Sequence, residues 1–188
     1  MKKLFTLLAL TITFSMNAQL TAVTEGGNTG QRLSTSNASN HGDIGSNAVD
    51  LSYQSSTSST RGATGVRAVA MGLKTTASGT NSTAMGNLTT ASGNQTTAMG
   101  FQSTASGDSS TAIGRSTTAS GSYSTAMGQS TTASGDNSTA LGYYTSASGG
   151  YGAIAMGNQT TASGANSTVM GEGGTASGAA STAMGRGT

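Results

Sequence analysis

The chain has 188 residues, and Thr, Ser, Gly and Ala fill 119 of these positions, with 33, 30, 29 and 27 copies. Cys, Pro and Trp are absent and only 7% of the residues are charged, whereas an ordinary globular domain is about a quarter charged. This composition excludes a disulfide framework, a collagen triple helix and a conventional core of large side chains.

Residues 1–18 have the form of a secretory signal peptide. Lys2 and Lys3 precede an apolar run from Leu4 to Phe14, and small or polar residues follow up to Ala18. The run is shorter than the ~20 apolar residues that a membrane-spanning helix needs. We therefore expect cleavage after Ala18, a secreted product and no membrane-spanning segment.

Cleavage after Ala18 would leave a chain without net charge. Six basic residues would face six acidic ones: Arg32, Arg61, Arg67, Lys74, Arg115 and Arg186 against Glu25, Asp43, Asp50, Asp108, Asp136 and Glu172. Because no basic patch remains, the sequence predicts no nucleic-acid partner and no attraction to anionic lipid.

An internal repeat dominates residues 61–188. From Ala70 onward the unit Ala-x-Gly recurs every seven residues, with one extra residue between Gly142 and Gly157. The middle residue alternates between a large apolar side chain and Ser, so the true repeat has fourteen residues. One half reads as in Ser82-Thr83-Ala84-Met85-Gly86, and the other as in Thr89-Thr90-Ala91-Ser92-Gly93.

The repeat favours β-structure over a coiled coil. Gly in every heptad and β-branched Thr beside it are poor helix residues, and a coiled coil needs two apolar positions per heptad. Five-residue strands separated by Asn, Asp or Ser turns fit better. The sequence therefore predicts an all-β parallel β-roll, a solenoid of nearly nine 14-residue coils and roughly 40 Å in length.

Alternation along the strands suggests which side chains fill the roll. Residues two apart share a face, and a roll whose interior is lined by Ala and Gly avoids burying unpaired hydroxyls. We expect these core residues to face inward: Ala84, Gly86, Ala91, Gly93, Ala98 and Gly100.

The same alternation places large apolar side chains on the outside of the roll. A continuous exposed stripe of this kind marks an interaction surface, so we expect it to meet copies of the same chain. A copper-binding methionine tract is the alternative, but no His or Cys accompanies the row. The predicted oligomer interface consists of Val69, Met71, Met85, Met99, Ile113, Met127, Leu141, Ile154, Met156, Met170 and Met184.

The two alternating half-repeats resemble the head repeats of YadA-like trimeric autotransporter adhesins over about Ala63 to Gly185. The resemblance implies a left-handed roll, three chains side by side with the apolar residues facing the trimer axis, and a bacterial surface protein that binds host matrix or cell surfaces. Such adhesins continue into a coiled-coil stalk and a membrane anchor. Since neither follows the repeats, we expect a fragment, the product of a shortened gene, or a separately secreted head.

Residues 19–60 lack the repeat, and we expect a non-repetitive cap and linker. The segment Asn47–Ser52 is predicted to form a strand that caps the first coil, and Ser52–Thr60 to form a linker.

No catalytic, cofactor or metal site is predicted. The single histidine, His41, lies in a polar loop with no partner set, and the acids are scattered. Asp occupies only two repeat turns, Asp108 and Asp136, which argues against a calcium-binding roll.

Two further surfaces remain as hypotheses. The second half-repeat places Thr90 and Ser92 on one uncharged face in every coil, and such a regular hydroxyl ladder is the basis of an alternative function, ice binding. Tyr143, Tyr144 and Tyr151 are large turn residues that we expect to be exposed and available to a partner.

Overall fold

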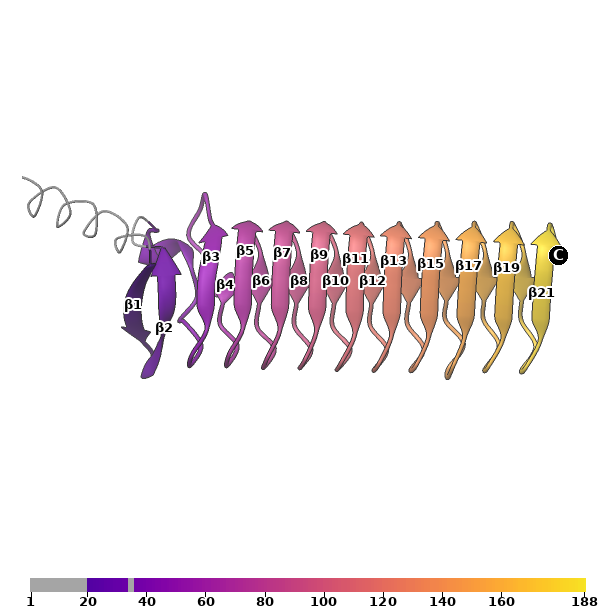
Figure 1. Cartoon of the computed structure of the whole chain (residues 1–188), viewed down its shortest axis with the longest axis horizontal. Helices are drawn as coiled ribbons and strands as arrows, with labels where there is room; N and C mark the ends of the chain where they lie inside the picture. The colour runs from indigo at the N-terminus through magenta and orange to yellow at the C-terminus, as the bar shows by residue number, and fades with distance from the viewer. Residues whose placement is uncertain (1–19, 34–35) are drawn as a thin grey trace, which may run out of the picture.

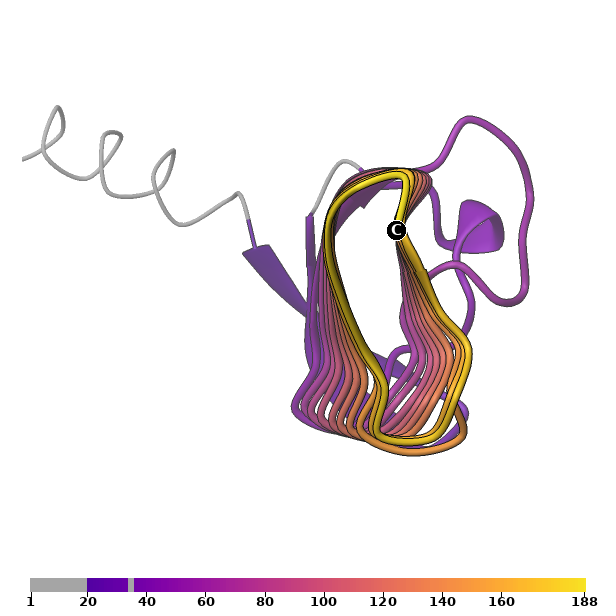
Figure 2. The same ribbon diagram turned by 90° about the vertical axis from the view of Figure 1, so that its right-hand side faces the viewer.

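The computed structural model describes residues 20–33 and 36–188, which form a rod of stacked coils (Figure 1). The expected signal peptide at residues 1–18 lies outside the described residues. Viewed along the rod, the repeats superpose as flattened loops with two long sides, as Figure 2 shows. The predicted all-β parallel β-solenoid with a fourteen-residue period is therefore confirmed.

The first half-repeat forms the long strands, which make up most of a 12-stranded sheet. These strands pair in parallel with the equivalent strand of the next coil, fourteen residues on, or fifteen from β15 to β17. Gly lies opposite Gly, as in Gly86↔Gly100, and Ala opposite Ala, as in Ala84↔Ala98, except where Val169 takes the alanine position. The strands are β5 (Val69–Leu73), β7 (Thr83–Asn87), β9 (Thr97–Phe101), β11 (Thr111–Arg115), β13 (Thr125–Gln129), β15 (Thr139–Tyr143), β17 (Ile154–Asn158), β19 (Thr168–Glu172) and β21 (Thr182–Arg186).

The second half-repeat forms a nine-stranded sheet on the other long side of the coils. Its strands are only two residues long, because the chain bends away on both sides of each Thr-Ala pair. They are β4 (Gly62–Ala63), β6 (Thr76–Ala77), β8 (Thr90–Ala91), β10 (Thr104–Ala105), β12 (Thr118–Ala119), β14 (Thr132–Ala133), β16 (Ser146–Ala147), β18 (Thr161–Ala162) and β20 (Thr175–Ala176).

The segment before the repeats extends the long-strand sheet beyond the nine expected coils. β3 (Val49–Tyr53) pairs in parallel with β5, so a strand does form close to the predicted segment 47–52. β2 (Asn28–Leu33) pairs in parallel with β3, and β1 (Leu20–Glu25) closes the sheet as an antiparallel hairpin partner. A 3₁₀ helix, η1 (Ala38–Asn40), and the loop 54–61 cover the side of the first coil.

The interior of the roll holds a column of alanines, flanked by buried Ser and Thr residues such as Ser82 and Thr89. Among the residues that the structure describes, the hydroxyls of these two have no hydrogen-bond partner, so the expectation that an interior of Ala and Gly avoids burying unpaired hydroxyls is wrong. Ala84, Ala91 and Ala98 are fully buried, as is nearly every equivalent alanine along the rod, and Gly93 is buried as expected. Gly86 and Gly100 differ from the expectation, because both are exposed. Their φ angles of 120° and 109° lie in a region that L-residues with a side chain rarely adopt. These two glycines lie inside β7 and β9, one residue before each strand ends, and do not fill the core.

One coil breaks the alanine column and compensates within itself. Val169 occupies the alanine position of β19 and is fully buried. Five residues later Gly174 stands where the equivalent coils carry a buried Thr or Ser, such as Thr117. A Cβ on Gly174 would lie 3.0 Å from Cγ2 of Val169. The missing side chain at Gly174 therefore makes room for the extra methyl groups of Val169.

Candidate interaction surfaces

The long-strand sheet carries a row of large apolar side chains on its outer face. Successive members pair in register, as Met85 does with Met99 and Ile113 does with Met127. Met71, Met127 and Met170 are 38–39% exposed and Met184 is 59% exposed. We call this row the apolar stripe; it consists of Val69, Met71, Met85, Met99, Ile113, Met127, Leu141, Ile154, Met156, Met170 and Met184.

The structure extends the apolar stripe toward the N-terminus. Val49 pairs with Val69, and Leu51 pairs with Met71, so β3 continues the same two columns. Sequence analysis missed these residues because they precede the first recognisable repeat. Their spacing from Val69 and Met71 is 20 residues, since the longer loop 54–61 lies between β3 and β4.

The short-strand sheet presents a different face, made of hydroxyl groups. The threonines pair in register from coil to coil, as Thr90 does with Thr104 and Thr104 with Thr118, with Ser146 at one position. The outer residues of this sheet carry no charge. At its N-terminal end the loop that contains Thr57–Thr60 overhangs the sheet and forms a polar groove over Thr76 and Ser78.

The turns form the two long edges of the rod, and polar side chains stack along them. Asn94 accepts a hydrogen bond from the backbone N–H of Thr80 at 3.1 Å, and Asp136 accepts one from Ser122 N–H at 2.9 Å. One turn residue per edge and coil adopts a left-handed conformation, even where it is as large as Leu88 (φ 58°), Tyr123 (φ 57°) or Tyr144 (φ 52°). Such a conformation is uncommon for large residues.

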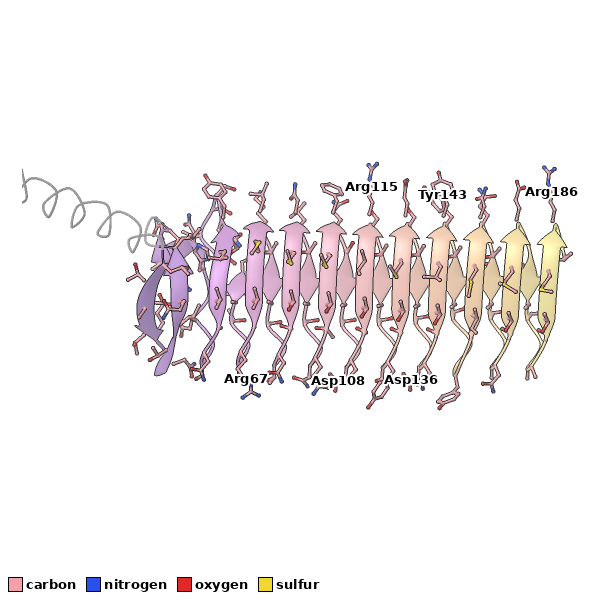
Figure 3. All side chains as sticks on the ribbon, viewed as in Figure 1. Arg67, Asp108, Arg115, Asp136, Tyr143 and Arg186 are labelled. Carbon is pink, nitrogen blue, oxygen red and sulfur yellow. The ribbon has the colours of Figure 1, made fainter. Side chains whose placement is uncertain are left out.

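The three tyrosines singled out from the sequence do not form one cluster. Tyr143 ends β15 and Tyr144 follows it on one edge, where their ring centroids are 4.5 Å apart in an edge-to-face arrangement. Tyr151 pairs with Asp136, which lies on the opposite edge from Tyr143 (Figure 3). All three are exposed, by 43%, 53% and 57% respectively, but a single partner site would contact either the pair or Tyr151.

A buried charged cluster closes the N-terminal end of the roll. Asp50 lies in the alanine column, opposite Ala70, and is fully buried. Nδ1 of His41 lies 2.8 Å from Oδ2 of Asp50, and Nε of Arg32 lies 3.5 Å from the same oxygen. Arg32 also donates to Glu25 at 2.7 Å. His41 therefore has a buried carboxylate partner that the sequence did not reveal.

The ionised form of Asp50 is held in place by hydrogen bonds. Burial raises the pKa of Asp50. Hydrogen bonds from the His41 side chain and from the hydroxyl and backbone N–H of Ser52 lower this pKa, as does the charge of His41, and together they outweigh the effect of burial. As a result, the pKa of Asp50 lies below its ordinary value of 3.8. A buried carboxylate is tolerated only with such partners, so we interpret this cluster as the structural closure of the roll.

Across the part of the chain that the structure describes, no group of three or more His, Asp or Glu side chains is arranged to hold a metal ion. None of the helices within residues 20–33 and 36–188 has the length and apolar character to cross a membrane.

Comparison with known protein families identifies the repeats. A protein-family model described as "YadA head domain repeat (2 copies)" matches residues 63–89, 91–117, 119–145, 148–173 and 162–188. No curated protein matches the chain significantly. The matched segments cover well over half of the chain and coincide with the roll from β4 to β21. The chain therefore belongs to the YadA head family.

Proposed function

We propose that this chain is the head of a secreted, non-catalytic adhesin at a bacterial cell surface. It assembles with copies of itself, three as in YadA-like adhesins, and binds host matrix or other cell surfaces. The repeat family supports adhesin-type function. The observation that carries the assembly is the apolar stripe, which runs along one whole face of the rod without a charged residue.

The energetics of the roll favour association. The interior holds almost only small residues, alanine together with buried Ser and Thr, which offer little apolar area against the entropy of ordering the backbone. Each large side chain of the stripe that becomes buried contributes ~1.5–3 kcal/mol, and exposed methionines adapt well to a neighbouring surface. A bundle of parallel rods would then display the same turns several times, so that weak contacts add up by multivalency.

A pair of lysine variants in one coil tests this proposal. Ile113→Lys places a charge in the apolar stripe, and Thr118→Lys places the same charge on the hydroxyl face of the same coil. Assembly is measured by analytical ultracentrifugation, and adhesion is measured on plates coated with extracellular-matrix extract and on mammalian cell monolayers.

We expect Ile113→Lys to dissociate the assembly and to lower apparent adhesion by roughly 10²-fold, the scale of avidity that multivalent binding confers. Thr118→Lys should leave both unchanged. Equal adhesion by the two variants, or no adhesion by the unmodified chain, would refute the proposal.

A second candidate function is ice binding by the hydroxyl face. The observation in its favour is the in-register ladder Thr76, Thr90, Thr104, Thr118, Thr132, Ser146, Thr161 and Thr175. If the hydroxyl face binds ice, the unmodified chain must show thermal hysteresis. Thr118→Lys must then abolish this hysteresis, and Ile113→Lys must retain it. The adhesin proposal expects no thermal hysteresis from any of the three proteins.

Tyr143 and Tyr144 are proposed contact residues for the adhesive partner, and Tyr151 is proposed as a separate contact on the other edge. Tyrosine is enriched among residues that dominate binding energy. Because Tyr144 retains a left-handed conformation that a smaller residue would adopt more easily, its ring is better explained by a role at the surface than by the turn itself.

A further inference from the structure

The charges of the roll are confined to its two edges. Between residues 62 and 188 every charged side chain lies in a turn or at the last position of a long strand, as Arg115, Glu172 and Arg186 do in β11, β19 and β21. The turns that precede the long strands hold Arg67, Asp108 and Asp136, and we call these turns the acidic edge. The opposite edge, formed by the last residues of the long strands and the turns that follow them, holds Lys74, Arg115, Glu172 and Arg186, and we call it the basic edge. Figure 3 shows the labelled members of the two sets on opposite sides of the rod.

Asp108 and Arg115 belong to the same coil and lie across the roll from each other. Asp108 stands three positions before β11 (Thr111–Arg115) begins, and Arg115 is the last residue of that strand. Both are exposed. Asp108 accepts hydrogen bonds from Asn94, and the Arg115 guanidinium lies 5.8 Å from the Phe101 ring centroid. No ion pair within the described residues involves either side chain.

Symmetry decides which edges meet when copies associate. In a closed ring whose axis runs parallel to the rods, each copy presents one edge to the neighbour on one side and the other edge to the neighbour on the other side. Closure also forbids a net shift along the axis, so each coil faces the same coil of the next copy. Asp108 of one copy is thereby brought to the level of Arg115 in its neighbour.

We propose that a second copy of this chain docks its acidic edge against the basic edge of the first, and that an ion pair between Asp108 and Arg115 fixes the register of the two rods. This inference rests on the proposed assembly through the apolar stripe. Charge complementarity of this kind sets specificity and register more than affinity. The pair favours the register that ring closure requires, because two rods that have not yet closed a ring could otherwise pair out of step by whole repeats.

Two other coils bear on the same register. Asp136 shares a coil with Tyr143, whose hydroxyl can donate to a carboxylate. Arg67 and Lys74 share the first coil and would bring like charges together. The guanidinium of Arg67 turns toward the next coil instead, where Nε donates to Oδ1 of Asn81 at 2.7 Å.

A charge swap tests the proposal in the full chain. Asp108→Arg and Arg115→Asp are made singly and together, and the dissociation constant of the assembly is measured by analytical ultracentrifugation at two salt concentrations. Each single variant places like charges opposite each other and should weaken assembly roughly tenfold. The double variant recreates the pair with reversed sign and should return to within about threefold of the unmodified chain.

Arg186→Gln is the control, since its coil carries Ala179 and Ala180 on the acidic edge. It removes only an exposed contact with Glu172 of the same chain, at 3.5 Å, and should leave assembly unchanged. The absence of native cysteine allows a second readout. The double variant Asp108→Cys, Arg115→Cys should form disulfide-linked multimers under mild oxidation, whereas each single cysteine should not.

The outcomes separate this inference from the proposed assembly. If the unmodified chain assembles but the double swap is as weak as the sum of the single variants, and the two cysteines do not cross-link, the Asp108–Arg115 register is wrong and the assembly stands. If the unmodified chain does not assemble, both proposals are overturned.

Discussion

At the scale of single residues, the two half-repeats each require a glycine, but for different physical reasons. Gly93 is buried and lies where the backbones of successive coils approach closely. Gly100 is exposed, has a φ of 109°, and a Cβ there would collide with the carbonyl oxygen of Gly114 in the next coil. A sequence shows both as an invariant seventh residue, so the pattern alone could not distinguish the buried glycine position from the exposed one within the strand.

The first prediction concerns Gly100, the exposed glycine inside β9. Gly100→Ala should destabilise the roll by ~1–3 kcal/mol, because it combines a strained φ with a backbone clash. Gly150→Ala is the control, since φ at Gly150 is not positive and a Cβ there meets nothing within 4 Å. Urea unfolding followed by circular dichroism measures both. Equal stability of the two variants would contradict the role assigned to Gly100.

Asp50 and His41 show what a repeat pattern cannot reveal. Nine residues and a loop separate them, and they meet only because β3 places Asp50 in the core column beside the loop that follows η1. The sequence predicted a strand in this segment, but not that it would carry a buried carboxylate. Where a polar residue replaces the expected small one at a core position, its partners must be sought in three dimensions.

The second prediction concerns this cluster. Asp50→Asn should cost ~3–5 kcal/mol of stability at the N-terminal end, because it leaves the buried Arg32 without one of its two carboxylate partners. Asp43→Asn is a matched control in the same segment, since Asp43 is exposed. Hydrogen exchange of β1, β2 and β3 measures the effect, while β9 should exchange at the same rate in all variants. Unchanged exchange in Asp50→Asn would contradict the closure role.

The lowered pKa of Asp50 adds a pH dependence to this cluster. A carboxyl group with a lower pKa in the folded than in the unfolded chain contributes stability above its ordinary value of 3.8, and this stability is lost as the pH falls through the folded value. We therefore expect the N-terminal strands to open below about pH 3.8. Asp50→Asn should remove this acid sensitivity.

At the scale of the elements, the sequence predicted the strands and turns well and their lengths less well. The expected five-residue strand 82–86 is shifted by one position in β7 (Thr83–Asn87). The second expected strand, 89–93, shrinks to the two residues of β8 (Thr90–Ala91). In the first case the strand continues through the exposed Gly86 and ends at Asn87. The second difference arises because the buried Gly93 bends the chain directly after Ser92.

The third prediction tests how tightly a coil is filled. Gly174→Thr introduces a side chain against Val169 and should destabilise the C-terminal coils by ~1–3 kcal/mol. The double variant Val169→Ala, Gly174→Thr recreates the pattern of the other coils and should recover most of this loss. Thermal unfolding of the single and double variants measures the coupling. A double variant no better than Gly174→Thr alone would show that Val169 and Gly174 do not compensate each other.

At the scale of the whole molecule, the fourteen-residue period was sufficient to predict the solenoid and the apolar stripe. The period did not predict which side chains of the turns would lie on the same edge of the rod and which on opposite edges. Tyr143 and Tyr151 are eight residues apart, yet they lie on opposite edges, because half a coil separates them. The same half-coil places Asp108 and Arg115 across the roll from each other. Such relations depend on how each coil closes, which the residue types do not specify.

The central claim is that the apolar stripe brings several rods together, and the molar mass of the chain in solution tests it most directly. Light scattering coupled to size-exclusion chromatography should give a multiple of the single-chain mass, three copies by the family relationship, and Ile113→Lys should reduce it to one. A folded protein that remains a single chain across the accessible concentration range would contradict the account.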